Sequence, residues 1–272
     1  MSSIPIPLIR YAVGGWTFFI VENTVLSHNR TYLISQLFSG DESLYHACYG
    51  TLSTVAMGLT FYGYRQIRGK GPFTRVGGGR LGLAFGLQAL GLMGLSQLAP
   101  KLQIPYYKAS SPPPISSPSP SPGPSPVPTP SPSSTVWQVR CPFDFKTPDH
   151  DSVHGVGRVS RHSTLWSFAF FSLGSAFATP AVPTALCFAM PVAVAAIGGE
   201  HQDYRYRRGM GGVLPEDVDR RTSNVPFLAM VTGRQGGIGE AFGGLFEEFK
   251  GLNAAAAAGV AVGMALRRGR GR

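Results

Sequence analysis

The sequence has few charged residues, fewer acidic than basic ones, and very few cysteines. Only 14% of its 272 residues are charged, whereas soluble domains usually carry about a quarter. The net charge is +10, from 24 Lys and Arg against 14 Asp and Glu. The three cysteines are too few and too scattered for a disulfide framework or a Cys/His zinc site. These shortages argue against a soluble enzyme and against a secreted disulfide scaffold.

Long uncharged runs are abundant instead. Residues 163–199 are 37 positions without a charge, residues 43–64 are 22 and residues 81–100 are 20. About 20 apolar residues are enough to span a bilayer, so the chain is predicted to be an integral membrane protein. The Lys and Arg residues cluster beside these runs and form no stripe with interleaved aromatics, so we expect no nucleic-acid partner. No cleavable presequence is evident.

We predict an all-α fold, a polytopic membrane bundle of about six transmembrane helices with a disordered Pro/Ser-rich insert. The predicted membrane segments are residues 11–26, 43–64, 81–98, 163–178, 182–199 and 251–266. Glu22 and Asn23 interrupt the first segment, and the last is short enough to be tilted, flanked by snorkelling arginines, or interfacial. Pro180 and Pro183 separate the fourth and fifth segments and predict a tight hairpin turn.

Residues 110–134 contain eleven prolines in 25 positions, mostly alternating with serine. Such a segment cannot form a helix or a strand ladder and should be extended and polyproline-like, serving as a linker or as a docking tract. We therefore divide the chain into N-terminal membrane helices (1–108), the disordered insert (109–135) and C-terminal membrane helices (136–272).

Counting six spans places the N-terminus, residues 65–80 and the C-terminal tail on one membrane face. That face is strongly basic, as cytoplasmic or equivalent faces are. The opposite face receives residues 27–42, 99–162 and 200–250. Two Gly-x-x-x-Gly spacings, Gly82 to Gly86 and Gly259 to Gly263, predict places where helices approach closely.

Four of the six histidines lie at span ends on the opposite face: His28, His46, His162 and His201. An imidazole at the edge of the hydrocarbon needs a partner, which favours an ionisable or ligating role. The alternative is an ordinary imidazole at the level of the lipid headgroups.

Two local motifs combine histidine with charged side chains. Arg158, Arg161 and His162 precede the fourth segment, and His201 and Asp203 follow the fifth, so the predicted hairpin brings the two motifs together. Two imidazoles can bind a haem iron axially, and a carboxylate can fix the ring tautomer. The arginines suit haem propionates or another anion. Alternatively, Arg161 and Asp203 form an ion pair that only fastens the hairpin.

The sequence around these two motifs resembles that of the NnrU-like membrane proteins. The blocks that carry the resemblance are residues 158–162, Asp203 with 205–208, 221–227, and 233–235. The resemblance as a whole covers roughly residues 21–64 and 156–235, and not the region between.

The resemblance implies an integral membrane protein that, in the carotenoid branch of the family, holds haem b through histidine and isomerises 15-cis-zeta-carotene. Reduced iron that has released one ligand is thought to engage the polyene and lower the bond order of its central cis double bond. By position, His162 is then an axial ligand and, with Arg161, a catalytic residue. His201 is the candidate second iron ligand, and Arg158 and Asp203 complete the cofactor site.

The sequence departs from that branch at several positions. Glu22 and Asn23 stand where the branch has a histidine, and another expected histidine is replaced near residues 173–174. Ser163 replaces a proline, and Thr232 often corresponds to a glutamate. The missing histidine leaves His201, or else His28, to supply the second ligand.

Three functional hypotheses follow. The first is a haem-dependent carotenoid isomerase in a plastid membrane, whose partners are the lipid bilayer and a lipophilic polyene. The second is a membrane methyltransferase that uses S-adenosylmethionine, because such enzymes also place an Arg-His pair before a membrane hairpin, and residues 221–226 loosely resemble the segment that follows it. The third is a non-catalytic haem-binding paralogue linked to nitrogen-oxide metabolism.

Overall fold

The computed structural model describes residues 5–102, 106–110, 135–139, 143–144, 153–210 and 212–270. The chain divides into two compact units, one made of Met1–Ala99 with Thr147–Arg272 and the other of Pro100–Lys146. Most of the predicted Pro/Ser-rich insert, residues 111–134, lies outside the described residues, as do Cys141 and His150.

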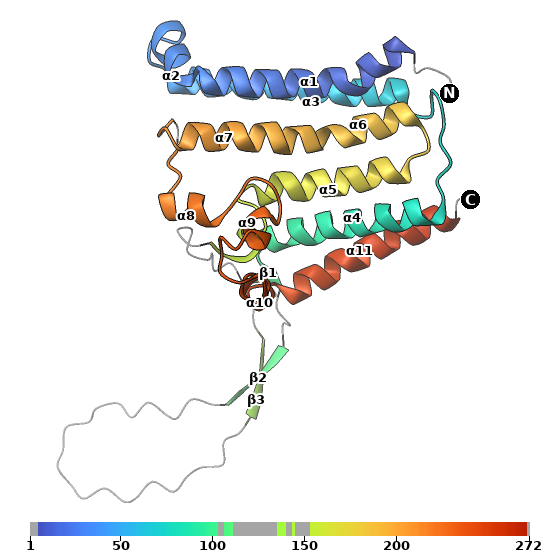
Figure 1. The fold of residues 1–272 in the computed structure, drawn as a ribbon, viewed down its shortest axis with the longest axis vertical. Coiled ribbons are helices and arrows are strands. Elements are labelled where there is room, and N and C mark those ends of the chain that lie inside the picture. The colour runs from blue at the N-terminus through green and yellow to red at the C-terminus, as the bar shows by residue number, and fades with distance from the viewer. Residues whose placement is uncertain are drawn as a thin grey trace, which may run out of the picture. The chain divides into compact units, whose positions relative to one another are not determined.

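The first unit is helical, and helices occupy all six segments predicted from the sequence (Figure 1). The long helices are α1 (Ile6–His28), α3 (Glu42–Ile67), α4 (Gly78–Leu98), α5 (Ser163–Ala178), α6 (Val182–Ala193) and α11 (Gly251–Arg270). A π-helical turn, η3 (Val194–Gly198), joins α6 to α7 (Gly199–Tyr206). The short elements are α2 (Arg30–Tyr32), η1 (Leu33–Leu37), η2 (Gly155–Gly157), α8 (Glu216–Arg221), α9 (Leu228–Val231) and α10 (Ile238–Glu247).

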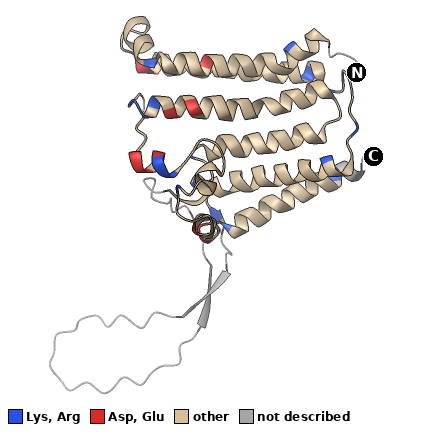
Figure 2. Cartoon of the chain, viewed as in Figure 1, with Lys and Arg blue, Asp and Glu red and all other residues tan. Residues whose placement is uncertain are grey.

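The long helices pack in a row in the order α3, α1, α6, α5, α4 and α11 (Figure 1). One end of the row holds both termini, the α3–α4 connection and the α5–α6 turn. The other end holds α2 and α7 to α10. At the first end the described charged residues are Lys and Arg, whereas both signs of charge gather at the second (Figure 2). We call these the basic end and the mixed-charge end.

Two helical stretches of the described chain are long and apolar enough to cross a membrane. They are α4 and the continuous stretch Val182–Tyr206. A third appears if α10 and Gly251–Arg267, which are bent by 88° at a short break, are one span. The described chain is therefore mostly helical, with two to three apolar helices compatible with an integral membrane protein.

Helix α1 continues through the polar residues that interrupt the first predicted segment. The Ser53 hydroxyl of α3 donates to Glu22 Oε1 at 2.7 Å, and Asn23 Nδ2 donates to the Phe19 carbonyl at 2.9 Å. Asn23 Oδ1 also accepts from the Tyr49 hydroxyl of α3, so Ser53 and Tyr49 of α3 supply partners that a lone helix in hydrocarbon would lack.

The predicted hairpin turn between the fourth and fifth segments is confirmed. Helix α5 ends at Ala178 and α6 begins at Val182. The turn is joined to the α3–α4 connection by two backbone hydrogen bonds, from Thr74 to the Pro180 carbonyl at 2.8 Å and from Val182 to the Pro72 carbonyl at 3.0 Å. The fifth predicted segment, however, does not end at residue 199, because η3 and α7 extend the helix to Tyr206.

Close helix contact occurs between α4 and α5, at glycines other than the predicted ones. A Cβ at Gly91 would lie 2.5 Å from the Phe171 amide nitrogen, and one at Gly174 would lie 2.6 Å from the Ala84 carbonyl oxygen. The prediction from Gly-x-x-x-Gly spacing was wrong, because Gly82, Gly86, Gly259 and Gly263 have no atom within 4 Å of an added Cβ among the residues compared.

The second unit contains short strands, which the all-α prediction did not include. β2 (Tyr106–Ser110) pairs antiparallel with β3 (Thr135–Val139), and β1 (Lys101–Leu102) pairs with β4 (Phe143–Asp144). Ser110 lies opposite Thr135, so its prediction as part of a segment that forms no ladder was wrong. Thr and Val in β3 suit a pleated strand, and the paired ends flank the proline-rich residues.

Candidate functional site

The two predicted motifs contact one another at the mixed-charge end. His162 precedes α5, and its Nε2 lies 2.8 Å from Oδ1 of Asp203 in α7. Only 9% of the His162 side chain and 3% of the Asp203 side chain are exposed. Arg161 Nη1 lies 3.5 Å from the other oxygen of Asp203. One buried carboxylate therefore holds both the imidazole and a guanidinium.

A second carboxylate, Asp219 of α8, completes this arrangement. Arg161 Nη1 donates to Asp219 Oδ1 at 2.5 Å, and Arg207 donates to both Asp219 oxygens at 2.7 and 2.9 Å. The hydrogen bonds from Arg207 and then from Arg161 hold the pKa of the Asp219 carboxyl well below its usual range, because they favour its ionised form. Sequence reasoning missed Asp219, and its place two residues before the 221–227 block was the available signal.

Asn224 connects the same region to α5 and η3. Its side-chain oxygen accepts from Trp166 Nε1 at 3.0 Å, and its Nδ2 donates to the Ala196 carbonyl in η3 at 3.0 Å. The Ser160 hydroxyl donates to the Asn224 carbonyl at 2.6 Å. Residues 158–162 and 221–227 are thus bonded into one structure. We call Arg161, His162, Asp203, Asp219 and Asn224 the Arg–His cluster.

Arg158 lies beside this cluster with a carboxylate of its own. Its Nε and Nη2 donate to the two oxygens of Glu248 at 2.9 and 2.5 Å, a bidentate pair. The Arg158 guanidinium lowers the pKa of the Glu248 carboxyl below its usual range. Arg158 therefore already has an anionic partner, and Glu248 is another residue that sequence reasoning missed.

The Arg–His cluster is packed tightly against α7. A Cβ added at Gly199 would lie 2.4 Å from Asn224 Oδ1 and 2.9 Å from His162 Cδ2, so only glycine lets α7 approach this closely. Because His162 Nε2 contacts a carboxylate and the ring is almost fully buried, the arrangement does not fit a haem iron at that nitrogen.

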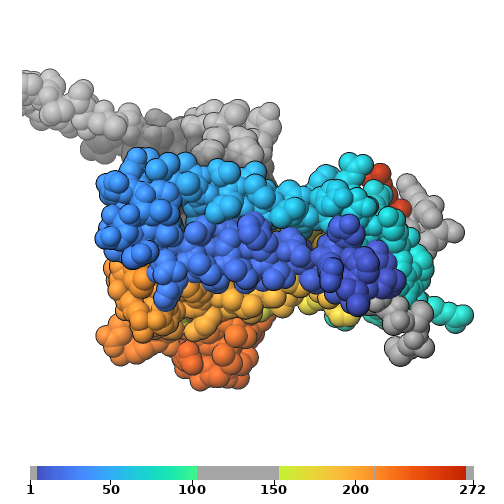
Figure 3. Space-filling view, turned by 90° about the horizontal axis from the view of Figure 1, so that it is seen from above, coloured from blue at the N-terminus to red at the C-terminus, as the bar shows by residue number. Residues whose placement is uncertain are grey.

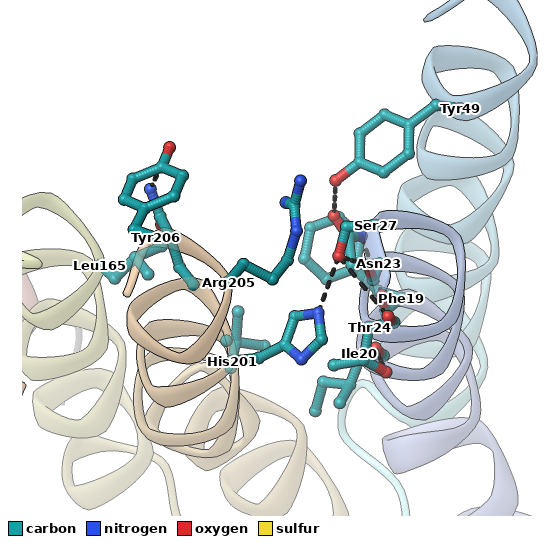
Figure 4. A pocket seen from close by; sticks show the side chains of 13 residues that line it. Phe19, Ile20, Asn23, Thr24, Ser27, Tyr49, Leu165, His201, Arg205 and Tyr206 are labelled. Atoms are coloured by element: carbon teal, nitrogen blue, oxygen red, sulfur yellow. Dashed lines mark hydrogen bonds between the residues drawn. The ribbon is translucent and has the colours of Figure 1, made fainter. Parts of the chain in front are cut away.

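His201 lies on the opposite side of α7. Positions 201 and 203 of a helix are separated by about 200° around its axis. His201 Nε2 lies 2.9 Å from the Ser27 hydroxyl of α1 (Figure 4), and its ring is 5.9 Å from that of His28. The structure therefore does not bring His162 and His201 together as a facing pair of axial ligands.

A cavity of about 310 Å³ adjoins His201. It lies between α1, α3, α5 and the η3–α7 stretch, and we call it the His201 pocket. Its main lining residues are Phe19, Ile20, Asn23, Ser27, Tyr49, Leu165, His201 and Arg205. Figure 4 shows Arg205 reaching into the space between α7 and the α1–α3 pair. The pocket combines apolar walls with a few polar groups, as small-molecule sites do.

No group of three or more His, Cys, Asp or Glu side chains that could hold a metal ion occurs within the described ranges. A lone imidazole can retain iron when a macrocycle supplies the other ligands, as in haem proteins. Among the predicted ligands, His201 has both an adjoining cavity and a neutral, rotatable hydroxyl as its partner. His201 is therefore the predicted ligand that has space beside its imidazole.

Comparison with family models, curated proteins and solved structures finds no match to this chain. The resemblance to the NnrU-like proteins therefore depends on the residue blocks alone. In the structure those blocks gather at the mixed-charge end around the Arg–His cluster.

Proposed function

We propose that this chain is a six-span integral membrane protein of the NnrU-like type. The spans are α1, α3, α4, α5, the α6–α7 stretch and α11. Support comes from the alternation of successive connections between the two ends of the row and from the absence of acidic residues among the described residues of the basic end. By the positive-inside pattern, the basic end faces the cytoplasm or its equivalent.

We further propose that the protein is a haem-dependent cis–trans isomerase of 15-cis-zeta-carotene in a plastid membrane. The observation that carries this proposal is His201 beside a cavity within the helix row. Haem b, when bound, supplies an iron centre that lowers the bond order of the central cis double bond. That part of the chemistry comes from the resemblance to the carotenoid branch.

The chain's own residues have separate roles in this proposal. His201 would bind the iron through Nδ1, because the Ser27 hydroxyl holds Nε2 and so orients the ring. Phe19, Ile20 and Leu165 provide an apolar wall that excludes water and suits a hydrocarbon substrate. The Arg–His cluster, including the predicted catalytic pair Arg161 and His162, positions α7 and so positions His201.

Expression in carotenoid-producing bacteria that lack the isomerase tests this function. We expect the 15-cis pool to fall with the wild-type chain and to stay high with His201→Gln. His154→Gln is the matched control, because that side chain is 42% exposed and does not line the His201 pocket. An unchanged 15-cis pool with folded wild-type protein would defeat the isomerase proposal. If haem were nevertheless bound, the non-catalytic haem-binding hypothesis would replace it.

A further inference from the structure

A smaller cavity of about 220 Å³ adjoins the His201 pocket. Ser27, Tyr49 and Arg205 line both cavities. Arg30, Tyr45 and His46 complete the smaller one, which we call the arginine pocket. The basic and aromatic side chains around it come from α2, α3 and α7, at the mixed-charge end.

Arg205 has no carboxylate within 4 Å among the residues that the structure describes. Its Nε is buried and lacks a hydrogen-bond partner there. Arg158, Arg161 and Arg207, at the same end of the molecule, each contact a carboxylate. A buried polar atom without a hydrogen-bond partner costs free energy, and a guanidinium that lines a cavity attracts an anion, so Arg205 calls for an anion that the described residues do not supply.

The other cation of the pocket is only partly neutralised. Arg30 contacts Glu42, which also lies 3.6 Å from His46 Nε2. The Glu42 side chain is 58% exposed, so solvent screens its charge. The arginine pocket therefore has two guanidinium groups and one screened carboxylate.

Apolar surface extends away from the pocket along the same helices. Phe18, Val21 and Val25 of α1 and Leu44 and Val55 of α3 are exposed. Figure 3 shows α1 and α3 side by side with their outward faces uncovered. Tyrosines beside such a surface are typical of the membrane–water interface.

We propose that the arginine pocket binds the phosphate of an anionic phospholipid headgroup, with the acyl chains along the exposed faces of α1 and α3. Arg205 is the principal partner, since a guanidinium pairs with phosphate through two parallel hydrogen bonds. This inference rests on the membrane placement proposed above, and it is independent of the isomerase chemistry. A hydrocarbon polyene has no anionic group, so the proposed substrate does not explain an arginine without a carboxylate partner among the described residues. The other anion in the proposal is a haem propionate, and the experiment below separates it from a lipid phosphate.

Native mass spectrometry of the detergent-purified full chain, with added phosphatidylglycerol or phosphatidylcholine, tests this inference. We expect preferential retention of phosphatidylglycerol and a loss of about tenfold in Arg205→Gln, the size of a lost charge-assisted hydrogen bond. Arg208→Gln is the control. It removes the same charge, but Arg208 lies outside the pocket with its Cζ 4.1 Å from the centre of the Tyr204 ring.

Other outcomes would overturn the inference. Equal losses in the two arginine variants would mean a general charge effect, and equal retention of the two lipids would mean no anion selectivity. Displacement of phosphatidylglycerol by millimolar inorganic phosphate would indicate a site for free phosphate. Loss of bound haem in Arg205→Gln, with lipid retention intact, would assign the arginine to a propionate. Recovery of the wild-type chain without detergent would instead defeat the membrane placement.

Discussion

The Arg–His cluster and the arrangement around His201 use similar side chains in opposite ways. In the cluster, His162 and Arg161 contact the buried carboxylate of Asp203. Across α7, the partner of His201 is a hydroxyl, and Arg205 has no carboxylate among the described residues. Buried charges that are paired with a carboxylate fix the structure, whereas polar groups beside a cavity can exchange their partners for a ligand.

This contrast separates the sequence motif from the proposed chemistry. The Arg-His motif attracts attention because its residues are chemically versatile, yet those residues hold the loop before α5 against α7 and α8. The proposed iron ligand is two positions from Asp203 and faces another helix. A single short helix thereby joins the structural cluster to the pocket.

Among the variants that test this contrast, Asp203→Ala should have the largest effect on the free energy of unfolding. Removing one partner of a buried charged group typically costs about 3–5 kcal/mol, because the other partner stays buried without compensation. Denaturant unfolding in detergent measures the change. Asp217→Ala is the control, because Asp217 is exposed on α8. Equal stabilities of the two variants would mean that the cluster does not hold the structure together.

Gly199→Ala should have the next largest effect. Its Cβ would lie 2.4 Å from Asn224 Oδ1, so α7 must move away from the cluster. Overpacking of this kind costs about 1–3 kcal/mol. Gly198→Ala is the matched control, since no atom lies within 4 Å of a Cβ at that position. We expect the thermal midpoint to fall for the first variant alone, and similar midpoints would show that α7 tolerates a wider separation.

Acidification should weaken the cluster through Asp219. Its folded-state pKa is depressed from the ordinary value of 3.8, so its contribution to stability is present above that value and is lost as the pH falls further. Unfolding midpoints measured between about pH 6 and pH 2 should decline less steeply in Asp219→Asn than in the wild type. Asp217→Asn should keep the wild-type slope. Parallel curves for all three proteins would contradict the assignment of this pH dependence to Asp219.

The smallest effect on stability is expected from Ser27→Ala. A single neutral hydrogen bond contributes about 0.5–1.5 kcal/mol, and the cavity beside it admits rearrangement. Unfolding in detergent should therefore change far less than for Asp203→Ala. A loss as large as that of Asp203→Ala would show that the His201 side of α7 is as rigidly held as the Arg–His cluster.

Several features of the fold could be predicted from particular residues. Uncharged runs located the long helices, and Pro180 with Pro183 located the turn between α5 and α6. The hairpin then correctly implied that His162 and Asp203 lie close together. Asp219 and Glu248 were missed because their contacts depend on how the chain returns after α7 and α10, which no local periodicity encodes.

The direction in which His201 points could not be predicted for a more specific reason. The fifth segment was predicted to end at residue 199, where the uncharged run ends, but packing of Gly199 against Asn224 and His162 accompanies a helix that continues to Tyr206. The π-helical turn η3 also changes the helical phase by one residue, so a regular 3.6-residue count misplaces everything after it. The sequence therefore predicted that His162 and His201 face one another, whereas in the structure they contact different helices.

The central claim is that His201 binds the iron and that the Arg–His cluster is structural. Its most direct test is the absorption spectrum of the detergent-purified protein, oxidised and then reduced, compared with His201→Gln and His162→Gln. We expect a Soret band that shifts on reduction, is lost in His201→Gln and persists in folded His162→Gln. Loss of the band in His162→Gln with folding intact, and its persistence in His201→Gln, would assign the iron to the Arg–His cluster and contradict the placement proposed here.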